Sequence, residues 1–533
     1  MKGKFWNRLL SGLTVALVGM SVLPLQAAAE WQHIGCMGDL NADGAVTRED
    51  LVLMRNHLLG ISGLTKENAY YVSDRYIGIG GSDGFQVDGG YLTTGDVNQD
   101  GVVDVFDLVI MRRNVIEGDE PWVWQWNDET ADFIDAPIND VKKYLPSQGE
   151  ANLVIFYVDF PDCQYEFTPT VEQIEEIAFG AEDTTDTNYP FDSMSAFYGR
   201  SSKGAMQLQG RAFRYTAQNP VAAYDGVSGR IGLAKEIYQA LDAWVDFSAF
   251  DGNGDGFIDA TLVSVPKAAG DSNWWPCAGP VDDYNFSVDG MLMGHLITSN
   301  SQIGGPTDYY GFNSTVLHEM GHCMGLPDYY LYHGTDTEGM HGTAGSEMMD
   351  VDATTDMSCV SKLQLGWYRE NQIQVYDAAM GTQSFTLANA QTDAGNVVLI
   401  PCGDLDARYH SEYMLIEYTT EDRNNSQPGW WQMMASGIRV YHVDATLHDN
   451  GWWVAYKYAS GSEFTNNDAG RRLLRIIDDR EVDNMYRTGD VVDGSIAGFH
   501  WYDENGNQTV ETGLQIEIGE LVDDQYTITI SQK

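Results

Sequence analysis

The stretch from His318 to Asp328 combines residue types that bind a metal ion and activate water. It begins with the sequence His-Glu-Met-Gly-His. On a helix, residues four apart lie on one face, so His318 and His322 can bind one ion with Glu319 beside them. Catalytic zinc takes three protein ligands and leaves a fourth position for water. A third ligand is therefore required beyond the two histidines.

The third ligand is expected directly after this helix. Gly325 favours helix termination, because glycine adopts left-handed backbone angles at little cost, and Pro327 prevents the helix from resuming. The reversal would bring Asp328 back toward the histidines. Three alternative ligands lie near enough in sequence to compete, and Asp328 could instead hydrogen-bond a ligand histidine. The alternatives are Glu338, Glu347 and His333.

The motif and several further segments resemble the immune inhibitor A family of secreted zinc metalloproteases, which belongs with the metzincin-like proteases. The resemblance covers about residues 150 to 450. It implies that His318, His322 and Asp328 hold zinc, that Glu319 is the catalytic base, and that a methionine turn lies under the metal. Met349 matches that turn best, with Met348 next. The supporting segments are residues 153–161, 251–259, 361–367, 413–417 and 436–444.

The composition is that of a folded, multidomain protein. The chain has 533 residues, which is too long for one ordinary domain, and its 43% hydrophobic and 12% aromatic content can build sizeable cores. A net charge of -48 repels nucleic acid and anionic membranes, whereas aspartates grouped in loops attract calcium. We therefore expect that the protein does not bind nucleic acid.

The N-terminus has the pattern of a secretory signal peptide over residues 1–29. Basic residues precede an apolar run from Leu9 to Leu25, and small residues follow as a cleavage site. We expect a secreted, extracellular protein; a retained membrane anchor is the alternative, and no other segment could span a bilayer. Six cysteines are too few for a disulfide scaffold. Cys323 is expected to point away from the ligand face of its helix.

Residues 36–118 contain an internal repeat of two calcium-type loops, each leading into a helix. Oxygen ligands at loop positions 1, 3, 5 and 12, with glycine at position 6, suit a hard cation. The helices show matching apolar residues at helical spacing. The expected calcium ligands are Asp39, Asn41, Asp43 and Asp50 in the first repeat, and Asp96, Asn98, Asp100, Asp104 and Asp107 in the second.

These paired loop-helix repeats resemble a dockerin, the module that attaches exported enzymes to cohesin domains of a cellulosome-type scaffold. The resemblance implies a small α module whose loop positions 10 and 11 contact the cohesin. Residues 61 to 94 depart from it as a longer connection rich in glycine and tyrosine. A calcium-stabilised module without a partner is the alternative. The candidate cohesin contacts are Arg48, Glu49, Val105 and Phe106.

The remaining chain divides into three further segments. Residues 119–150 are expected to form a linker, residues 151–368 an α/β (α+β) zincin-type catalytic core, and residues 369–533 a β-rich region that partly completes the protease. The run Leu153 to Phe160 predicts a buried central strand. The stretch Arg230 to Phe247 predicts a helix with apolar residues on one face, including Trp244.

A third acidic loop lies between residues 251 and 259. Its oxygen-bearing residues suit calcium, but Leu262 stands at position 12, so the loop is not a complete EF-type site. The alternative is a turn whose side chains satisfy its own backbone. The candidate calcium ligands are Asp251, Asn253, Asp255 and Asp259.

Together these features predict a secreted zinc endopeptidase that acts on protein or peptide substrates and binds a cohesin-bearing scaffold, cell-bound or free. A non-catalytic adhesin or scaffold component is one alternative, although the intact Glu319 argues against it. A carbohydrate-active enzyme is another, because tryptophan pairs such as Trp274-Trp275 could stack on sugars. The sequence shows no paired carboxylates for glycoside hydrolysis.

Overall fold

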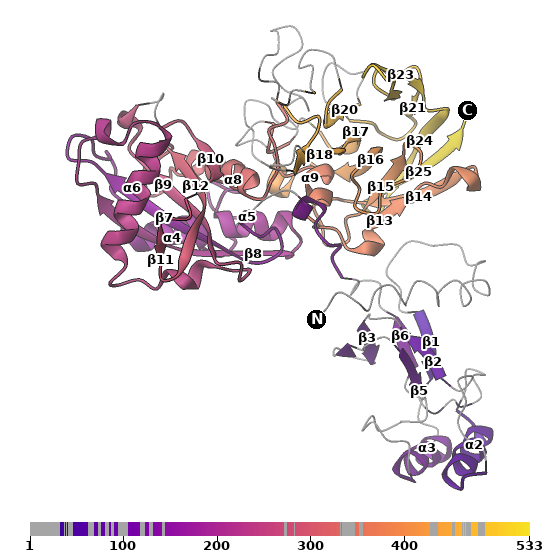
Figure 1. Ribbon diagram of the computed structural model, residues 1–533. Coiled ribbons are helices and arrows are strands. Elements are labelled where there is room, and N and C mark those ends of the chain that lie inside the picture. Colours follow the sequence, from indigo (N-terminus) through magenta and orange to yellow (C-terminus); the bar gives the residue numbers. More distant parts are fainter. Residues whose placement is uncertain are drawn as a thin grey trace. The chain divides into compact units, whose positions relative to one another are not determined.

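The structure is a computed structural model of the chain. It divides into two compact units, Met1–Ala131 and Asp132–Lys533 (Figure 1). The predicted signal peptide lies outside the described residues. Of the predicted calcium ligands of the repeat, only Asp50 has a side chain that the structure describes. The described residues are 32–36, 38, 40, 46–61, 69–72, 76–79, 85–86, 90–93, 105–117, 123–126, 132–140, 144–270, 274–281, 283–330, 332, 347–350, 355–426, 435–449, 454–460, 462, 464, 471–477 and 485–533.

The first unit contains the two helices that the repeat predicts. These are α2 (Arg48–Leu58) and α3 (Val105–Glu117). They pack through Met54 and Met111, which hold equivalent positions in the repeat and are both fully buried, with Leu40 beside them. The helical part of the repeat is therefore confirmed.

Short strands accompany the helices of the first unit. The expectation of a purely helical module is wrong for the described residues, because segments rich in Tyr, Val and Ile favour extended backbone. One sheet has the order β1-β6-β3-β4, and β2 pairs with β5. The bounds are β1 (Gln32–Cys36), β2 (Ala69–Val72), β3 (Tyr76–Ile79), β4 (Phe85–Gln86), β5 (Gly90–Thr93) and β6 (Val123–Trp126).

The second unit opens with a mixed sheet in the order β10-β12-β9-β7-β8, to which β11 adds beside β12. β7, β8, β9 and β12 pair in parallel, whereas the edge strand β10 is antiparallel to β12. The buried strand predicted over residues 153–160 is confirmed within β7. The bounds are β7 (Gly149–Asp159), β8 (Met206–Thr216), β9 (Phe257–Ser264), β10 (Cys277–Pro280), β11 (Ser287–Val288) and β12 (Met291–Ser299).

Helices cover both faces of this sheet, as the alternation of β7 requires. Leu153 and Ile155 face a core shared with α4 (Val171–Phe179), α5 (Met194–Ser201) and α8 (Tyr310–Cys323). Val154 and Phe156 face a second core shared with α6 (Gly226–Leu241). This half of the unit therefore has three layers, with α8 and α6 on opposite sides of the sheet.

The helix predicted over Arg230 to Phe247 is confirmed as α6, but it ends at Leu241. Trp244 lies beyond that end, in a turn closed by its amide bonding to the carbonyl of Leu241 at 2.8 Å. Its side chain is 86% exposed, so its predicted place on the buried helix face is wrong.

The predicted linker is shorter than expected at its C-terminal side. Residues 132–140 and 144–148 belong to the second unit, because Ala136, Ile138 and Leu145 are fully buried in its first core. A short 3-10 helix, η5 (Pro137–Asp140), lies within this segment.

The C-terminal half of the second unit is rich in β-structure. One sheet has the order β13-β15-β16-β17-β20 and another the order β14-β25-β24-β21, while β18 pairs with β19 and β22 with β23. The bounds are β13 (Ile373–Val375), β14 (Gln383–Ala388), β15 (Val397–Pro401), β16 (Glu412–Thr419), β17 (Gly437–Asp444), β18 (Leu447–Asp449), β19 (Val454–Tyr456), β20 (Leu474–Ile476), β21 (Val491–Asp493), β22 (His500–Tyr502), β23 (Gln508–Glu511), β24 (Leu514–Val522) and β25 (Gln525–Gln532).

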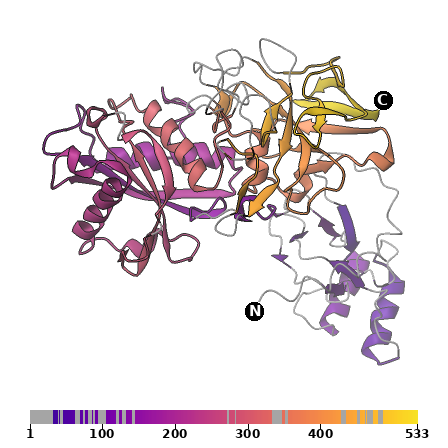
Figure 2. The same ribbon diagram turned by 45° about the horizontal axis from the view of Figure 1, so that its top comes forward.

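The strand β16 joins the two halves of this unit. Tyr413 and Leu415 belong to the core that contains α8, whereas Met414 and Ile416 face the core between the two C-terminal sheets. A second short helix, α9 (Cys359–Gln364), contacts β16. The two halves lie side by side in both ribbon views (Figures 1 and 2). The β-rich region therefore shares a hydrophobic core with the segment that carries the metal motif.

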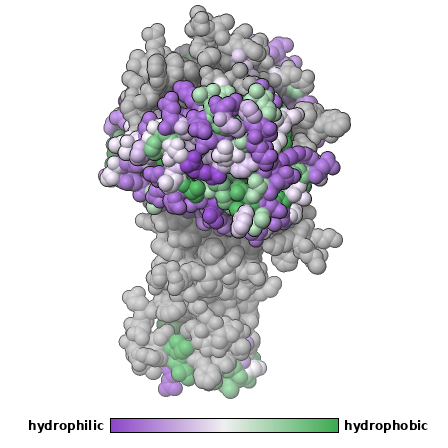
Figure 3. Space-filling model, turned by 90° about the vertical axis from the view of Figure 1, so that its left-hand side faces the viewer, coloured by the Kyte–Doolittle hydropathy of each residue, from purple (hydrophilic) through white to green (hydrophobic). Residues whose placement is uncertain are grey.

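On the face that Figure 3 shows, the surface of the second unit is mainly hydrophilic, with hydrophobic patches between the polar residues. Among the described residues, no helix is both long and apolar enough to cross a membrane. The fold of the second unit is thus mixed α/β followed by a β-rich region.

Candidate metal centre

The His-Glu-Met-Gly-His motif lies on α8, a helix that is buried on almost every side. A helix of this kind occupies the middle of a domain, and α8 contacts β10 and β12. His318 is 7% exposed and Glu319 is 5% exposed, whereas His322 is only partly buried one turn later. The motif therefore runs from the interior toward the surface.

The chain reverses after α8, as Gly325 and Pro327 predict. Gly325 has a φ of +105°, which side chains rarely adopt. Its amide donates to the carbonyl of His322 at 2.9 Å, and the amide of Leu326 donates to the carbonyl of Gly321 at 3.0 Å. These two bonds form the Schellman arrangement that ends a helix. The reversal turns the following residues back toward the histidines.

The structure brings the two histidines and Asp328 together. Oδ1 of Asp328 lies 3.1 Å from Nε2 of His318 and 3.2 Å from Nε2 of His322. Among the described residues, this is the only group of three or more His, Cys, Asp or Glu side chains whose ligand atoms lie close enough to hold one ion, within 4.8 Å of one another. The predicted spatial grouping of the three residues is confirmed.

The alternative third ligands do not join this group. Glu347 bonds to residues of another segment, and His333 and Glu338 lie outside the described residues. Cys323 is a buried free thiol outside the ligand group.

Backbone carbonyls fix the orientation of both imidazoles. Nδ1 of His318 lies 2.9 Å from the carbonyl oxygen of Met348, and Nδ1 of His322 lies 2.8 Å from that of Leu326. A carbonyl can only accept, so each Nδ1 carries the proton and each neutral ring presents the lone pair of Nε2 to Asp328. Two lone pairs and a carboxylate oxygen then face one another. This arrangement requires a shared proton or a cation.

The charges of the centre favour the shared proton when no cation is bound. Burial alone lowers the pKa of an imidazole, yet the hydrogen bond to Asp328 and the charge of Glu319 raise the pKa of His318 to about 9. Burial raises the pKa of a carboxyl, yet the two imidazoles hold the pKa of Asp328 well below its usual range. A divalent cation can replace the proton that this group otherwise binds.

A tyrosine that no sequence pattern indicated fixes the orientation of Asp328. The hydroxyl of Tyr332 donates to Oδ2 of Asp328 at 2.8 Å. One carboxylate oxygen is thereby occupied, and Oδ1 is left to face the histidines. No spacing rule could have identified Tyr332, because it lies in an irregular segment four residues after the ligand.

The expected methionine turn packs against α8. The turn Glu347–Asp350 is closed by a bond of 3.0 Å from the amide of Asp350 to the carbonyl of Glu347, and Met348 and Met349 are fully buried. Sδ of Met349 lies so close to Gly321 that a Cβ there would overlap it. The turn thus supplies one carbonyl to His318 and one side chain to the helix surface between the histidines.

Segments of the C-terminal half fasten the surroundings of the centre. The hydroxyl of Ser460 donates to the carbonyl of Tyr330 at 2.7 Å. Before α9, the amide of Asp356 donates to Oδ1 of Asn425 at 2.8 Å, and the carboxylate of Asp356 pairs with Lys362 at 2.5 Å. The segments that flank the ligands are therefore tied to residues far along the chain.

The acidic loop over residues 251–259 is organised differently. Asp251 accepts from the amides of Asp255 at 3.0 Å and Gly256 at 2.9 Å, and Oδ1 of Asn253 accepts from the amide of Asp255 at 3.0 Å. Asp259 is fully buried and accepts from the amide of Asn152 at 2.8 Å. The side chains thus satisfy backbone amides, as in the alternative interpretation, and calcium binding stays a prediction.

In the first unit, Asp50 is the one predicted calcium ligand whose side chain is described. It is fully buried and accepts from the amides of Leu40 at 2.8 Å and Thr47 at 2.7 Å. The candidate cohesin contacts Arg48, Glu49 and Val105 are exposed. The side chain of Phe106 lies outside the described residues.

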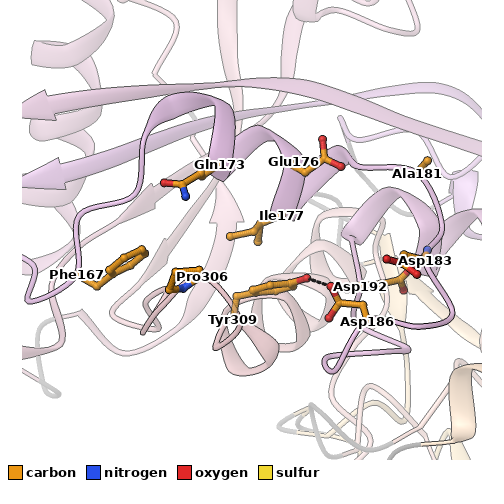
Figure 4. Close-up of a pocket in the computed structure, with 10 residues that line it drawn as sticks. All are labelled: Phe167, Gln173, Glu176, Ile177, Ala181, Asp183, Asp186, Asp192, Pro306 and Tyr309. Atoms are coloured by element: carbon orange, nitrogen blue, oxygen red, sulfur yellow. Dashed lines mark hydrogen bonds between the residues drawn. The ribbon is translucent and has the colours of Figure 1, made fainter.

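A pocket of about 250 Å³ lies at the other end of α8, where Tyr309 precedes the helix (Figure 4). His318 follows nine residues later, roughly 13 Å along the helix axis. Tyr309 donates a hydrogen bond to Asp186, and Asp192 pairs with Arg200 at 2.7 Å. Two of the pocket carboxylates, Asp186 and Asp192, are therefore engaged in structural bonds, and the lining of the pocket includes none of the residues of the metal centre.

The donor set of the centre could hold a divalent metal ion, and zinc is among the ions that accept it. Two oriented imidazole Nε2 atoms and one monodentate carboxylate are typical of zinc sites that keep a position for water. Comparison with known protein families gives no match, and comparison with curated proteins gives no similar sequence.

Proposed function

We propose that the second unit is a zinc-dependent endopeptidase. The observation that carries the proposal is the convergence of Nε2 of His318, Nε2 of His322 and Oδ1 of Asp328. Glu319 adds a buried carboxylate next to the first ligand on the same helix. A metal-binding group beside an acid-base group is the minimum that hydrolysis of an amide needs.

The roles of the residues follow from their positions. When bound, zinc would polarise a peptide carbonyl and make water nucleophilic near neutral pH. Glu319 would accept the proton of the attacking water and pass a proton to the leaving amine. The carbonyls of Met348 and Leu326 hold the imidazole rings in place, which limits reorganisation during the reaction.

The edge of the mixed sheet favours an extended peptide as substrate. Among the described strands, β10 pairs only with β12, and it contacts α8. A free strand edge can bind an extended chain through main-chain hydrogen bonds. A peptide added to β10 would therefore run alongside the helix that carries the ligands.

We also propose that the first unit docks the enzyme to a cohesin of a scaffold protein. Two exposed valines support this, because Val52 and Val109 hold equivalent positions in the repeat and are 44% and 59% exposed. Hydrophobic residues of this unit also reach the surface in Figure 3. Export through residues 1–29 would place the enzyme outside the cell, on a cell-bound or free complex.

The peptidase is tested by incubating the mature protein with casein and with plant polysaccharide, each with and without a zinc chelator. Casein cleavage that the chelator abolishes and zinc restores is expected. Cleavage of polysaccharide alone would favour a carbohydrate-active enzyme. Absence of both activities in a protein that contains zinc would favour a non-catalytic adhesin.

The docking proposal is tested separately. Asp39→Ala combined with Asp96→Ala removes the first ligand of each calcium loop, so cohesin binding is expected to disappear while casein cleavage persists. Binding is measured with a panel of cohesin domains in calcium. If the double variant binds as the wild type does, or if no cohesin binds the intact protein, the module is structural.

A further inference from the structure

Glu347 is a carboxylate enclosed by a hydrophobic core, and the proposed reaction does not use it. Its side chain has no solvent exposure, and the core around it includes Met348, Met349 and Leu363. Burial raises the pKa of Glu347 to about 7, although its hydrogen bonds lower it. Burying a carboxylate is costly unless its oxygens are satisfied. The hydrogen-bond partners of Glu347 should therefore explain why a carboxylate is buried here.

The partners of Glu347 lie at the start of α9. Its Oε2 accepts from the amide of Ser358, and its Oε1 accepts from the hydroxyl of Ser361 at 2.9 Å. Oε1 also receives the amide of Met349 at 3.4 Å. Both oxygens are thus occupied by a neighbouring helix and by its own turn. These contacts explain why Glu347 does not act as the third metal ligand.

The turn that Glu347 anchors holds both sides of the metal centre. The carbonyl of Met348 receives Nδ1 of His318, and the carbonyl of Met349 receives the amide of Tyr329, the residue after Asp328. The position of this turn therefore sets the orientation of His318 directly. It also holds the backbone beside Asp328 through the amide of Tyr329. Glu347 connects the turn to α9 through its side chain.

We propose that Glu347 is a positioning residue for the metal centre: it fastens the Glu347–Asp350 turn to α9 and so keeps His318 in the orientation that presents Nε2. The proposal rests on the proposed metal site and deepens it. Carboxylates that act through a ligand in this way change metal affinity by about 10- to 100-fold when removed. Glutamine at this position would offer one acceptor oxygen and an amide group that cannot accept from Ser358.

The test uses the full-length protein and the variants Glu347→Gln and Glu417→Gln. Glu417 is a matched control because it is a buried carboxylate, 3% exposed, that accepts from the hydroxyl of Tyr441 on the neighbouring strand at 3.0 Å. Zinc affinity is measured by competition with a chromophoric chelator, and the visible spectrum is recorded for the cobalt-substituted protein. Both readouts report on ligand geometry and neither requires turnover.

Glu347→Gln is expected to weaken zinc about 10- to 100-fold and to change the cobalt spectrum. Glu417→Gln is expected to lower the unfolding temperature while leaving affinity and spectrum unchanged. A Glu347→Gln protein that folds, loses stability and keeps wild-type affinity and spectrum would overturn the proposal. Equal losses of affinity in both variants would overturn it too.

If Glu347→Gln does not fold, Ser361→Ala replaces it, since this change removes one partner and leaves the carboxylate. A loss of affinity of less than about 10-fold with a changed cobalt spectrum is expected, and an unchanged protein would overturn the proposal. If the wild-type protein binds zinc but does not cleave casein, the peptidase proposal is wrong and the proposal about Glu347 still stands. Wild-type protein that binds no zinc would end both.

Discussion

The ligand helix and the acidic loop over residues 251–259 both carry metal-type spacing, yet the structure treats them differently. On α8 the backbone amides bond within the helix, so the side chains of His318 and His322 are left to meet Asp328. In the loop the amides have no regular partners, and the side chains of Asp251 and Asn253 accept from them. Side chains at metal-type spacing are available to bind an ion when the backbone amides already have hydrogen-bond partners elsewhere, as they do within a helix.

The largest expected effect tests the helix side of this comparison. Glu319→Gln removes the acid-base group without removing a ligand, so casein cleavage is expected to fall by about 10³- to 10⁴-fold while zinc content stays at the wild-type level. Activity and metal content are measured on the same preparation. Near-normal cleavage by this variant would exclude Glu319 as the base.

Asp328→Ala tests whether the carboxylate is a ligand. A ligand role predicts that zinc and activity are lost together, by more than about 100-fold, whereas support of a ligand histidine predicts a loss of about 10- to 100-fold. Metal content of the purified variant decides between them. Asp328→His is expected to restore part of the binding, because histidine is also a zinc ligand. Full zinc content in the alanine variant would place the third ligand elsewhere.

A smaller effect is expected on the loop side. Burial raises the pKa of Asp259 to about 7, from an ordinary value of 3.8. The folded protein therefore holds this proton more tightly than the unfolded chain does, and its contribution to stability is lost as pH rises from about 4 to about 7. Over pH 5 to 7 the wild type should lose about 2 kcal/mol relative to Asp259→Asn. Urea unfolding at several pH values measures it, and parallel curves would show that Asp259 titrates normally.

The smallest effect is expected from calcium at the same loop. An ion would compete with the amides of Asp255 and Gly256 for the carboxylate of Asp251, so weak binding is expected. Millimolar calcium should stabilise the wild type over Asp251→Asn by about 1 kcal/mol or less. Thermal unfolding of both proteins with and without calcium measures the difference. A large difference would show that the loop rearranges into a cation site.

The grouping of His318, His322 and Asp328 could be predicted from sequence because it depends on local geometry. The four-residue spacing of the histidines and the turn at Gly325 need no information from distant segments. Tyr332 and Glu347 could not be assigned their contacts, because these depend on irregular backbone and on packing against α9. The apolar spacing also predicted that the helix α6 includes Trp244, because this spacing continues past the end of the helix.

The domain boundaries were harder to predict for a related reason. Composition suggested a linker as far as residue 150, but a few apolar side chains such as Ile138 are sufficient to anchor a polar segment to a core. Strands in the first unit were missed because short runs between glycines carry little periodicity. The C-terminal half was predicted to be rich in β-structure, and strands such as β16 and β17, each eight residues long, confirm this.

The ties from Ser460 and Asn425 to the segments around the metal centre also set an order of events during synthesis. A growing chain contains all three ligands once Asp328 has been made, but the residues that fasten Tyr330 and Asp356 come much later. Domains assemble as units while the chain is produced from its N-terminus. Both contacts can therefore be in place only after residue 460 has been made, and a chain that ends earlier carries His318, His322 and Asp328 without them.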